Sequence, residues 1–246
     1  MRVIQGRVSK SLVFNGFLEK YGLEPYTRIR EPLVQYGAYP RDLDVLRTAT
    51  GPVIVIWAGT DLTLTAGKSL FKDPKFHHVA CSSMAEKDLT DAGLKYRRVN
   101  VLPVDTSDIK PAPLGKKIYA YAPRLRWTFY GGHHLEKLKK LGYPLAVADS
   151  HTKFSREELL EVYRDSYIGL RLTGHDSLSV TVCELGLMGR MCVYNEDTPN
   201  AIPWKNLNDI IAVLDRDWLP DPEKVASGMR EFLDCGTDWL DLSTWS

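Results

Sequence analysis

The chain lacks the features that mark several protein classes. It has only four cysteines among 246 residues, and none of them forms a Cys-x-x-Cys pair. No apolar run approaches the roughly 20 residues of a membrane-spanning helix, and polar residues interrupt the N-terminus where a signal peptide would be apolar. Internal repeats and low-complexity segments are absent too. These absences exclude a disulfide-stapled scaffold and predict a cytoplasmic protein whose cysteines are reduced core thiols.

Net charge is nearly absent, at +1, but basic and acidic residues separate along the chain. Residues 1–156 hold 25 Lys and Arg against 14 Asp and Glu, whereas residues 157–246 hold 7 against 17. The basic excess is densest between residues 116 and 140. This distribution indicates either a cationic surface lining a cleft for anionic ligands or a solvated helix face with scattered lysines.

From residue 53 onward, hydrophobic patterning alternates between strand and helix, which predicts parallel sheets. A segment rich in Pro, Asp and Ser over residues 104–115 interrupts this alternation, and the alternation then restarts. We therefore expect a domain over 1–108, a second over 109–220, and a helical tail over 221–246 that packs back on the first. The predicted strands cover 53–57, 78–81, 98–103, 117–121, 145–148, 167–172 and 191–194. Capping boxes at Ser83-x-x-Glu86 and Ser155-x-x-Glu158 each predict the start of a helix. Glycines and prolines divide the first 50 residues into short pieces, for which we expect two strands and two helices.

The most informative segment, residues 167–195, reads as strand, polar turn, helix and strand. The turn holds His175 and Asp176, and Glu184 follows eight residues after Asp176 on a helix predicted over 178–188. A helix N-terminus attracts phosphate through its unpaired N–H groups and its dipole. Flanking carboxylates accept hydrogen bonds from hydroxyls. This arrangement favours a nucleotide sugar, which carries a diphosphate with hydroxyls on both sides.

This segment resembles the donor-binding motif of family 4 glycosyltransferases, in which two acids, usually both Glu, are separated by seven residues. Asp176 and Glu184 are the matching pair here, and weaker likeness extends the resemblance to roughly residues 50–214. The resemblance implies the GT-B fold, with two Rossmann-like parallel-sheet α/β domains facing a cleft. The chain departs from the family in having Asp at the first acid, a reduced N-terminal domain and no evident glycine-rich first loop.

The resemblance further implies sugar transfer from a nucleoside-diphosphate sugar to an acceptor hydroxyl, with retention and without a cofactor or metal. Glu184 would accept hydrogen bonds from the ribose hydroxyls, His175 and Asp176 would face the transferred sugar, and Asp61 would lie near the acceptor. The remaining donor-binding candidates are the N–H groups of Ser177, Leu178 and Ser179, the cations Arg124, Arg126 and Lys153, and the first loop at Gly6 and Arg7.

Each of these residues also has an ordinary structural interpretation. Glu184 fits a solvated or capping acid, and His175 fits a turn residue. Surface ion pairs explain Arg124 and Arg126, and Asp61 fits the N-cap of the next helix.

Two other functions stay open at this point. Asp42-Leu-Asp44 and Asp215-Arg-Asp217 resemble the metal-binding triplet of GT-A glycosyltransferases, although capping explains the first of them. Alternatively, the chain is a non-catalytic module that binds nucleotide sugars or nucleic acid. For an enzyme, the expected acceptor is a glycan or lipid-linked sugar, and the basic half leaves hydroxylated DNA bases open as a nucleic-acid acceptor.

Overall fold

The computed structural model describes residues 2–4, 17–25, 30, 32–149, 154–216 and 220–245. The chain divides into two compact units. The first comprises Met1–Asp105, His175–Val180 and Leu233–Ser246, and the second comprises Thr106–Gly174 and Thr181–Phe232. The sequence-based division differs from this one, because it placed the boundary after residue 108 and set 221–246 apart as a tail.

The first unit is built on a parallel sheet with the strand order β2-β1-β3-β4-β5-β6. Branched apolar residues fill its central strands, and Val53, Val55 and Trp57 are fully buried in the core. The strands are β1 (Arg2–Ile4), β2 (Glu24–Pro25), β3 (Leu33–Tyr36), β4 (Val53–Ile56), β5 (Phe76–Ala80) and β6 (Tyr96–Arg98). The α-helices are α1 (Phe17–Lys20), α2 (Leu43–Thr48) and α3 (Ser83–Asp91).

Two details of the first unit correct the sequence-based expectation. The strand predicted over 98–103 is β6, which ends at Arg98. The helix predicted to be capped by Ser83 is α3, whose N-cap is Ser82: the Ser82 hydroxyl accepts the N–H of Ala85 at 3.1 Å.

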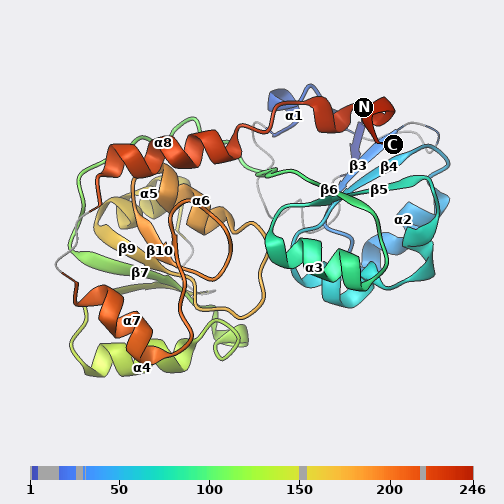
Figure 1. The fold of residues 1–246 in the computed structure, drawn as a ribbon. Helices are drawn as coiled ribbons and strands as arrows, with labels where there is room; N and C mark the ends of the chain where they lie inside the picture. Colours follow the sequence, from blue (N-terminus) through green and yellow to red (C-terminus); the bar gives the residue numbers. More distant parts are fainter. Residues whose placement is uncertain are drawn as a thin grey trace. The chain divides into compact units, whose positions relative to one another are not determined.

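The second unit is built on a parallel sheet with the order β11-β10-β9-β7-β8. Figure 1 shows α4 and α7 on one side of this sheet and α5, α6 and α8 on the other. The strands are β7 (Lys117–Tyr121), β8 (Leu145–Ala148), β9 (Ser166–Leu170), β10 (Met191–Val193) and β11 (Ala201–Ile202). The helices are α4 (Gly132–Lys140), α5 (Arg156–Arg164), α6 (Val180–Leu187), α7 (Leu207–Leu214) and α8 (Pro222–Leu233).

Strands β7 and β9 are neighbours in the second sheet, so the loops after them start at the same edge. These loops approach closely: a Cβ added to Gly131 would lie 2.6 Å from the Cβ of Leu172, and the φ angle of Gly131 is +67°. Glycine is the residue that meets both conditions. The prediction of two parallel-sheet α/β units is confirmed, and ligands of such sheets bind beyond the carboxyl ends of the strands.

A buried arginine fastens the beginning of the second unit to its sheet. Arg190, which precedes β10, is 0 % exposed. Its guanidinium donates to the carbonyls of Ala112 and Pro113 at 2.6 Å each. It also donates to Ser166 and Arg164 at 3.1 Å. Burial lowers the pKa of Arg190 to about 10. The C-terminal part of the predicted linker, at Ala112 and Pro113, is therefore held by hydrogen bonds from the Arg190 guanidinium to its backbone carbonyls.

None of the four cysteines is joined in a disulfide. Cys81, Cys183 and Cys192 are buried, as expected for core residues, whereas Cys235 is half-buried. Among the described residues, no helix combines the length and the apolar composition that a bilayer crossing requires.

Candidate donor-binding site

The acid-containing helix begins two residues later than predicted, at Val180. The turn before it is closed by Asp176, whose carboxylate accepts the N–H of Ser177 at 3.0 Å. Leu178 and Ser179 are 6 % and 5 % exposed, and their N–H groups donate to no other residue in the described part of the chain. Buried N–H groups are almost always paired in folded proteins. This pair of donors before a helix N-terminus is therefore suited to an anion.

The turn itself is grouped with the first unit, and three contacts hold it there. The Ser177 hydroxyl donates to the carbonyl of Trp57 at 3.2 Å. His175 Nε2 lies 2.8 Å from Asp88 Oδ2 on α3. Gly59 follows β4 with a φ angle of +119°, and a Cβ there would lie 3.6 Å from the Ser177 nitrogen. No sequence pattern indicates Asp88, because its contact with His175 spans 87 residues.

Glu184 lies in the second unit, on α6, and is 3 % exposed. One carboxylate oxygen is bonded to the Arg156 guanidinium, and the other accepts the hydroxyl of Tyr163 at 3.0 Å. Arg156 also forms a two-pronged ion pair with Asp108, with both bonds at 3.1 Å. Glu184 is thus neither a solvated acid nor a helix cap. Sequence reasoning missed Arg156, Tyr163 and Asp108.

The pKa shifts in this network have opposing causes. Burial raises the pKa of the Glu184 carboxyl above its ordinary value, and the Arg156 guanidinium acts against that rise. Partial burial acts to lower the pKa of Arg156, but Asp108 and Glu184 outweigh it and raise the pKa. Burial also raises the pKa of Tyr163 well above its ordinary value, so its hydroxyl stays protonated and donates.

Of the cations predicted to bind the donor, the structure describes Arg124 and Arg126 but not Lys153. Arg124 and Arg126 form an exposed 3-10 turn after β7, with Leu125 between them at 95 % exposure. Arg124 lies 3.4 Å from Asp149, which agrees with the surface ion-pair interpretation. Lys153, Gly6 and Arg7 lie outside the described residues.

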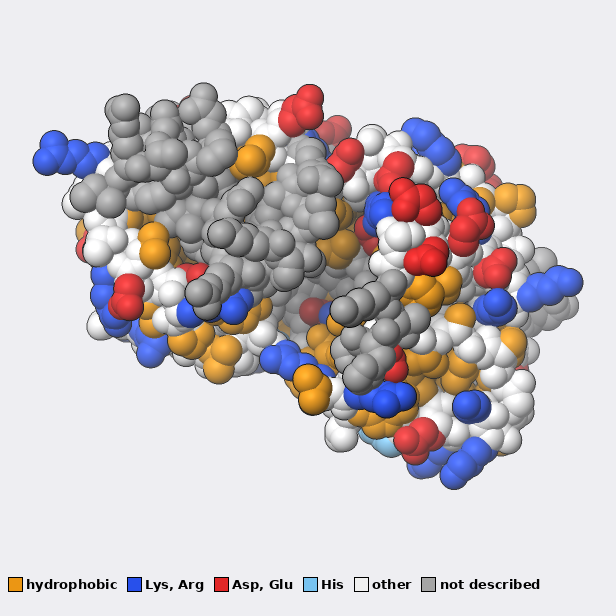
Figure 2. Space-filling view, turned by 180° about the vertical axis from the view of Figure 1, so that it is seen from behind, with side chains coloured by type: hydrophobic (Ala, Val, Ile, Leu, Met, Phe, Trp, Pro, Cys, Tyr) orange, Lys and Arg blue, Asp and Glu red, His pale blue; other side chains and the backbone are white. Residues whose placement is uncertain are grey.

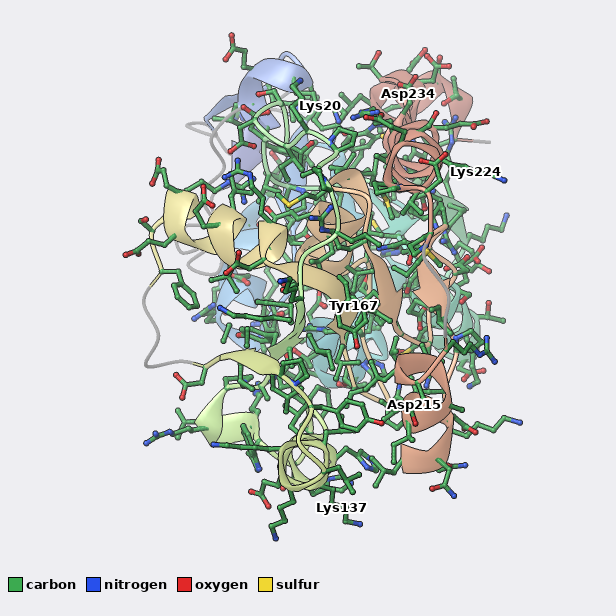
Figure 3. All side chains as sticks on the ribbon, turned by 90° about the vertical axis from the view of Figure 1, so that its left-hand side faces the viewer. Lys20, Lys137, Tyr167, Asp215, Lys224 and Asp234 are labelled. Atoms are coloured by element: carbon green, nitrogen blue, oxygen red, sulfur yellow. The ribbon has the colours of Figure 1, made fainter. Side chains whose placement is uncertain are left out.

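Acidic side chains lie beside the basic stretch over residues 116–140. Lys117 forms an ion pair with Asp165 at 3.2 Å, and Figure 2 shows red and blue side chains intermixed over its right-hand part, which carries the second unit. Figure 3 shows Lys137 on α4 at the rim of that unit. The described surface therefore includes mixed charge where the sequence indicated a basic excess.

Asp61 occupies the N-cap position of the short helix at Leu62–Ala66, as one of its two interpretations expected, but its side chain makes no capping hydrogen bond there. The side chain is 0 % exposed. Its carboxylate accepts the N–H of Ala38 at 2.9 Å and the N–H of Ala58 at 3.1 Å. Asp61 therefore ties together the turns that follow β3 and β4. This burial leaves its predicted place beside an acceptor without structural support.

The buried carboxyl of Asp61 should make the stability of the folded protein depend on pH. Burial raises its pKa from 3.8 to about 6, although the N–H groups of Ala38 and Ala58 act against the rise. The folded chain then binds this proton more tightly than the unfolded chain does, so the stabilisation is complete below about pH 4 and is lost as pH rises through about 6.

We expect the free energy of unfolding of the wild type, relative to Asp61→Asn, to fall by on the order of 2–3 kcal/mol between pH 4 and pH 7. Urea titrations at a series of pH values measure this difference, and Asp91→Asn, at an exposed acid, supplies the background. A difference that stays constant with pH would contradict the assignment.

The two Asp-x-Asp triplets have structural roles where they are described. Asp42 accepts the N–H of Tyr39 at 3.1 Å, and Asp44 pairs with Arg47 at 2.7 Å. Asp215 accepts the hydroxyl of Tyr143 at 2.5 Å at the end of α7 (Figure 3), and Asp217 lies outside the described residues. Within the described ranges, no three His, Cys, Asp or Glu side chains are grouped to hold a metal ion.

Comparison with known proteins rests on structure, because no family model matches the chain and no curated protein matches its sequence. A sucrose-phosphate synthase from Thermosynechococcus elongatus matches with 12 % identity and a TM-score of 0.54, over 92 % of this chain and 72 % of that one. A point mutant of the S. aureus protein TarM, in complex with Fondaparinux, alpha-GlcNAc-glycerol and UDP, matches with 12 % identity and a TM-score of 0.61, over 94 % and 58 %. A trehalose-6-phosphate synthase matches with 13 % identity and a TM-score of 0.54, over 95 % and 75 %.

All three structures are GT-B glycosyltransferases, and the chain spans 58 % to 75 % of their lengths. The GT-A alternative is not favoured, because the chain aligns over more than nine-tenths of its length with the other fold. Membership of family 4 in particular stays a prediction. The chain therefore has the GT-B fold of two Rossmann-like parallel-sheet domains.

Proposed function

We propose that this protein is a glycosyltransferase that moves a sugar from a nucleoside-diphosphate sugar to an acceptor hydroxyl. One observation supports this most strongly. In a GT-B chain, the N–H groups of two buried residues, Leu178 and Ser179, have no described partner and precede the helix that carries Glu184. Such donors fit a diphosphate.

In this proposal each residue of the motif has one task. The N–H groups of Leu178 and Ser179 bind the diphosphate. Glu184 accepts hydrogen bonds from the two ribose hydroxyls, for which a carboxylate has enough lone pairs. His175 and Asp176 contact the transferred sugar.

The rate gain comes from charge that develops on the diphosphate as the glycosidic bond breaks. Fixed donors and cations stabilise this charge more in the transition state than in the ground state. Arg126 is exposed on the turn after β7 and is the described cation that we assign to this task. Arg124 is a second, although it must leave or share Asp149.

We further propose transfer with retention, as in the trehalose-6-phosphate synthase neighbour, whose study addresses glycosyltransfer with retention. The acceptor that we propose is a glycan or another hydroxylated small molecule. The mixed charge of the second unit gives no specific support to a nucleic-acid acceptor.

A donor screen tests this function. The purified chain is incubated with UDP-, GDP- and ADP-sugars, and release of the nucleoside diphosphate is measured with and without pooled acceptor glycans. We expect release from one donor class that increases with acceptor. Binding of a nucleotide sugar without any release would instead identify a non-catalytic binding module, and no binding at all would refute the proposal.

A further inference from the structure

The first residue of α5 connects Glu184 to the segment that begins the second unit. Ser155 and Glu158 form a reciprocal capping box, which fixes the start of the helix at Arg156. Two nitrogens of the Arg156 guanidinium bond the two oxygens of Asp108, and a third bonds Glu184. A planar guanidinium bound at two points cannot rotate freely. Asp108 therefore fixes the direction from which Arg156 approaches Glu184.

The resulting carboxylate is oriented but not saturated. Each Glu184 oxygen has one partner, Arg156 on one and Tyr163 on the other. An ionised carboxylate offers about four lone-pair sites, so two remain in the described part of the chain. A vicinal diol supplies two donors. The capacity left on Glu184 therefore matches a ribose.

Burial alone would favour the wrong protonation state for this task. A protonated Glu184 would present an O–H donor to hydroxyls that need an acceptor. The Arg156 guanidinium opposes the effect of burial on Glu184. An ion pair between Arg156 and Glu184 with only a structural role would add little to the stability of the fold, because buried ion pairs rarely stabilise a protein more than a well-packed apolar contact does.

We infer that Arg156, held by Asp108, is a positioning residue of the nucleotide site that aims an ionised Glu184 at the two ribose hydroxyls. This inference rests on the proposed function. It adds two residues, from α5 and from the segment before β7, to a site that the motif alone places on α6.

The test compares ribose with 2′-deoxyribose. Binding of UDP, GDP and ADP to the wild type is measured by calorimetry, and the tightest of them is compared with its 2′-deoxy form. We expect the ribose form to bind about 10-fold more tightly, which corresponds to one hydrogen bond to a charged group. Arg156→Met should reduce this ratio to about 2-fold, with Arg156→Lys and Asp108→Asn intermediate.

Control variants distinguish a role of Arg156 in orienting Glu184 from a general effect on the stability of the fold. Arg164→Met removes an exposed arginine from the same helix, whose side chain pairs with Glu161, and should leave the ratio unchanged. Glu184→Gln should abolish it. If Arg156→Met does not fold, Arg156→Lys and Asp108→Asn decide the outcome.

Three results would overturn the inference or its basis, and they differ from one another. A wild type that binds none of the nucleotides refutes the proposed function. An unchanged ratio in the Arg156 and Asp108 variants, together with a collapsed ratio in Glu184→Gln, refutes only the role of Arg156. Tighter binding of the ribose form by Arg156→Met would show that Arg156 competes with the ribose, and this also refutes the inference.

Discussion

Conversion of Asp176 to asparagine is expected to lower sugar transfer by about 10- to 100-fold while leaving the protein folded. The carboxylate is proposed to accept hydrogen bonds from the transferred sugar, and a hydrogen bond to a charged group is worth about 1.5–3 kcal/mol. The local structure should survive, because the asparagine oxygen can still accept the N–H of Ser177, which Asp176 accepts at 3.0 Å. Steady-state kinetics on the donor identified by the screen measure the effect.

The comparison variant is Asp91→Asn, which alters an exposed carboxylate that pairs with Lys87 on α3. It should transfer sugar at the wild-type rate. If Asp176→Asn keeps full kcat and raises only KM for the donor sugar nucleotide, Asp176 contributes uniform binding and not stabilisation of the transition state. Full activity in both kinetic parameters would remove Asp176 from the site.

Replacement of Arg190 by methionine is expected to cost about 4 kcal/mol of unfolding free energy or more. The guanidinium donates to the carbonyls of Ala112, Pro113, Arg164 and Ser166, all of which would lose a charged donor in the interior of the second unit. The carbonyl of Ser166 keeps the N–H of Gly115 at 3.2 Å, and each of the other acceptors left unsatisfied in the interior costs roughly 1–3 kcal/mol. In a chain of this size the melting temperature should fall by about 10 °C.

Arg164→Met is a matched control for this prediction as well. The Arg164 side chain is exposed and pairs with Glu161, whereas its carbonyl still accepts from Arg190. It should change stability by less than about 0.5 kcal/mol. Arg190→Lys keeps the charge but has fewer donors and should recover only part of the loss. Melting curves that coincide for Arg190→Met and the wild type would contradict the assigned role.

Patterns local in sequence predicted most of the second unit. The strand expected over 117–121 is β7 at the same residues, and the capping box at Ser155 starts α5 as expected. These elements depend on neighbours a few residues away, which periodicity and capping record. The described part of the first 50 residues includes three short strands where two were expected, because strands of two to four residues carry too little periodicity to be recognised.

The part of the site that lies in one continuous segment could be predicted from the sequence. The part formed by contacts between residues far apart in the sequence could not. The acids at 176 and 184 are visible in the sequence, but the distant carboxylates beside the motif are not. Asp88 contacts His175 from 87 residues away, and Asp108 contacts Arg156 from 48 residues away. Asp61 shows the converse: its sequence context indicated a helix cap, whereas its contact with Ala38, 23 residues away, determines its burial.

Neither unit corresponds to one uninterrupted stretch of the gene. The first unit needs residues 175–180 and 233–246 in addition to residues 1–105. The final segment supplies Trp239, which is 1 % exposed and packs edge-on against Tyr21 at 5.4 Å. A fragment ending near residue 105 would therefore leave part of its own core uncovered. Recombination that exchanges one half of the chain as a cassette would separate side chains that are packed together, so the two halves are constrained to evolve jointly.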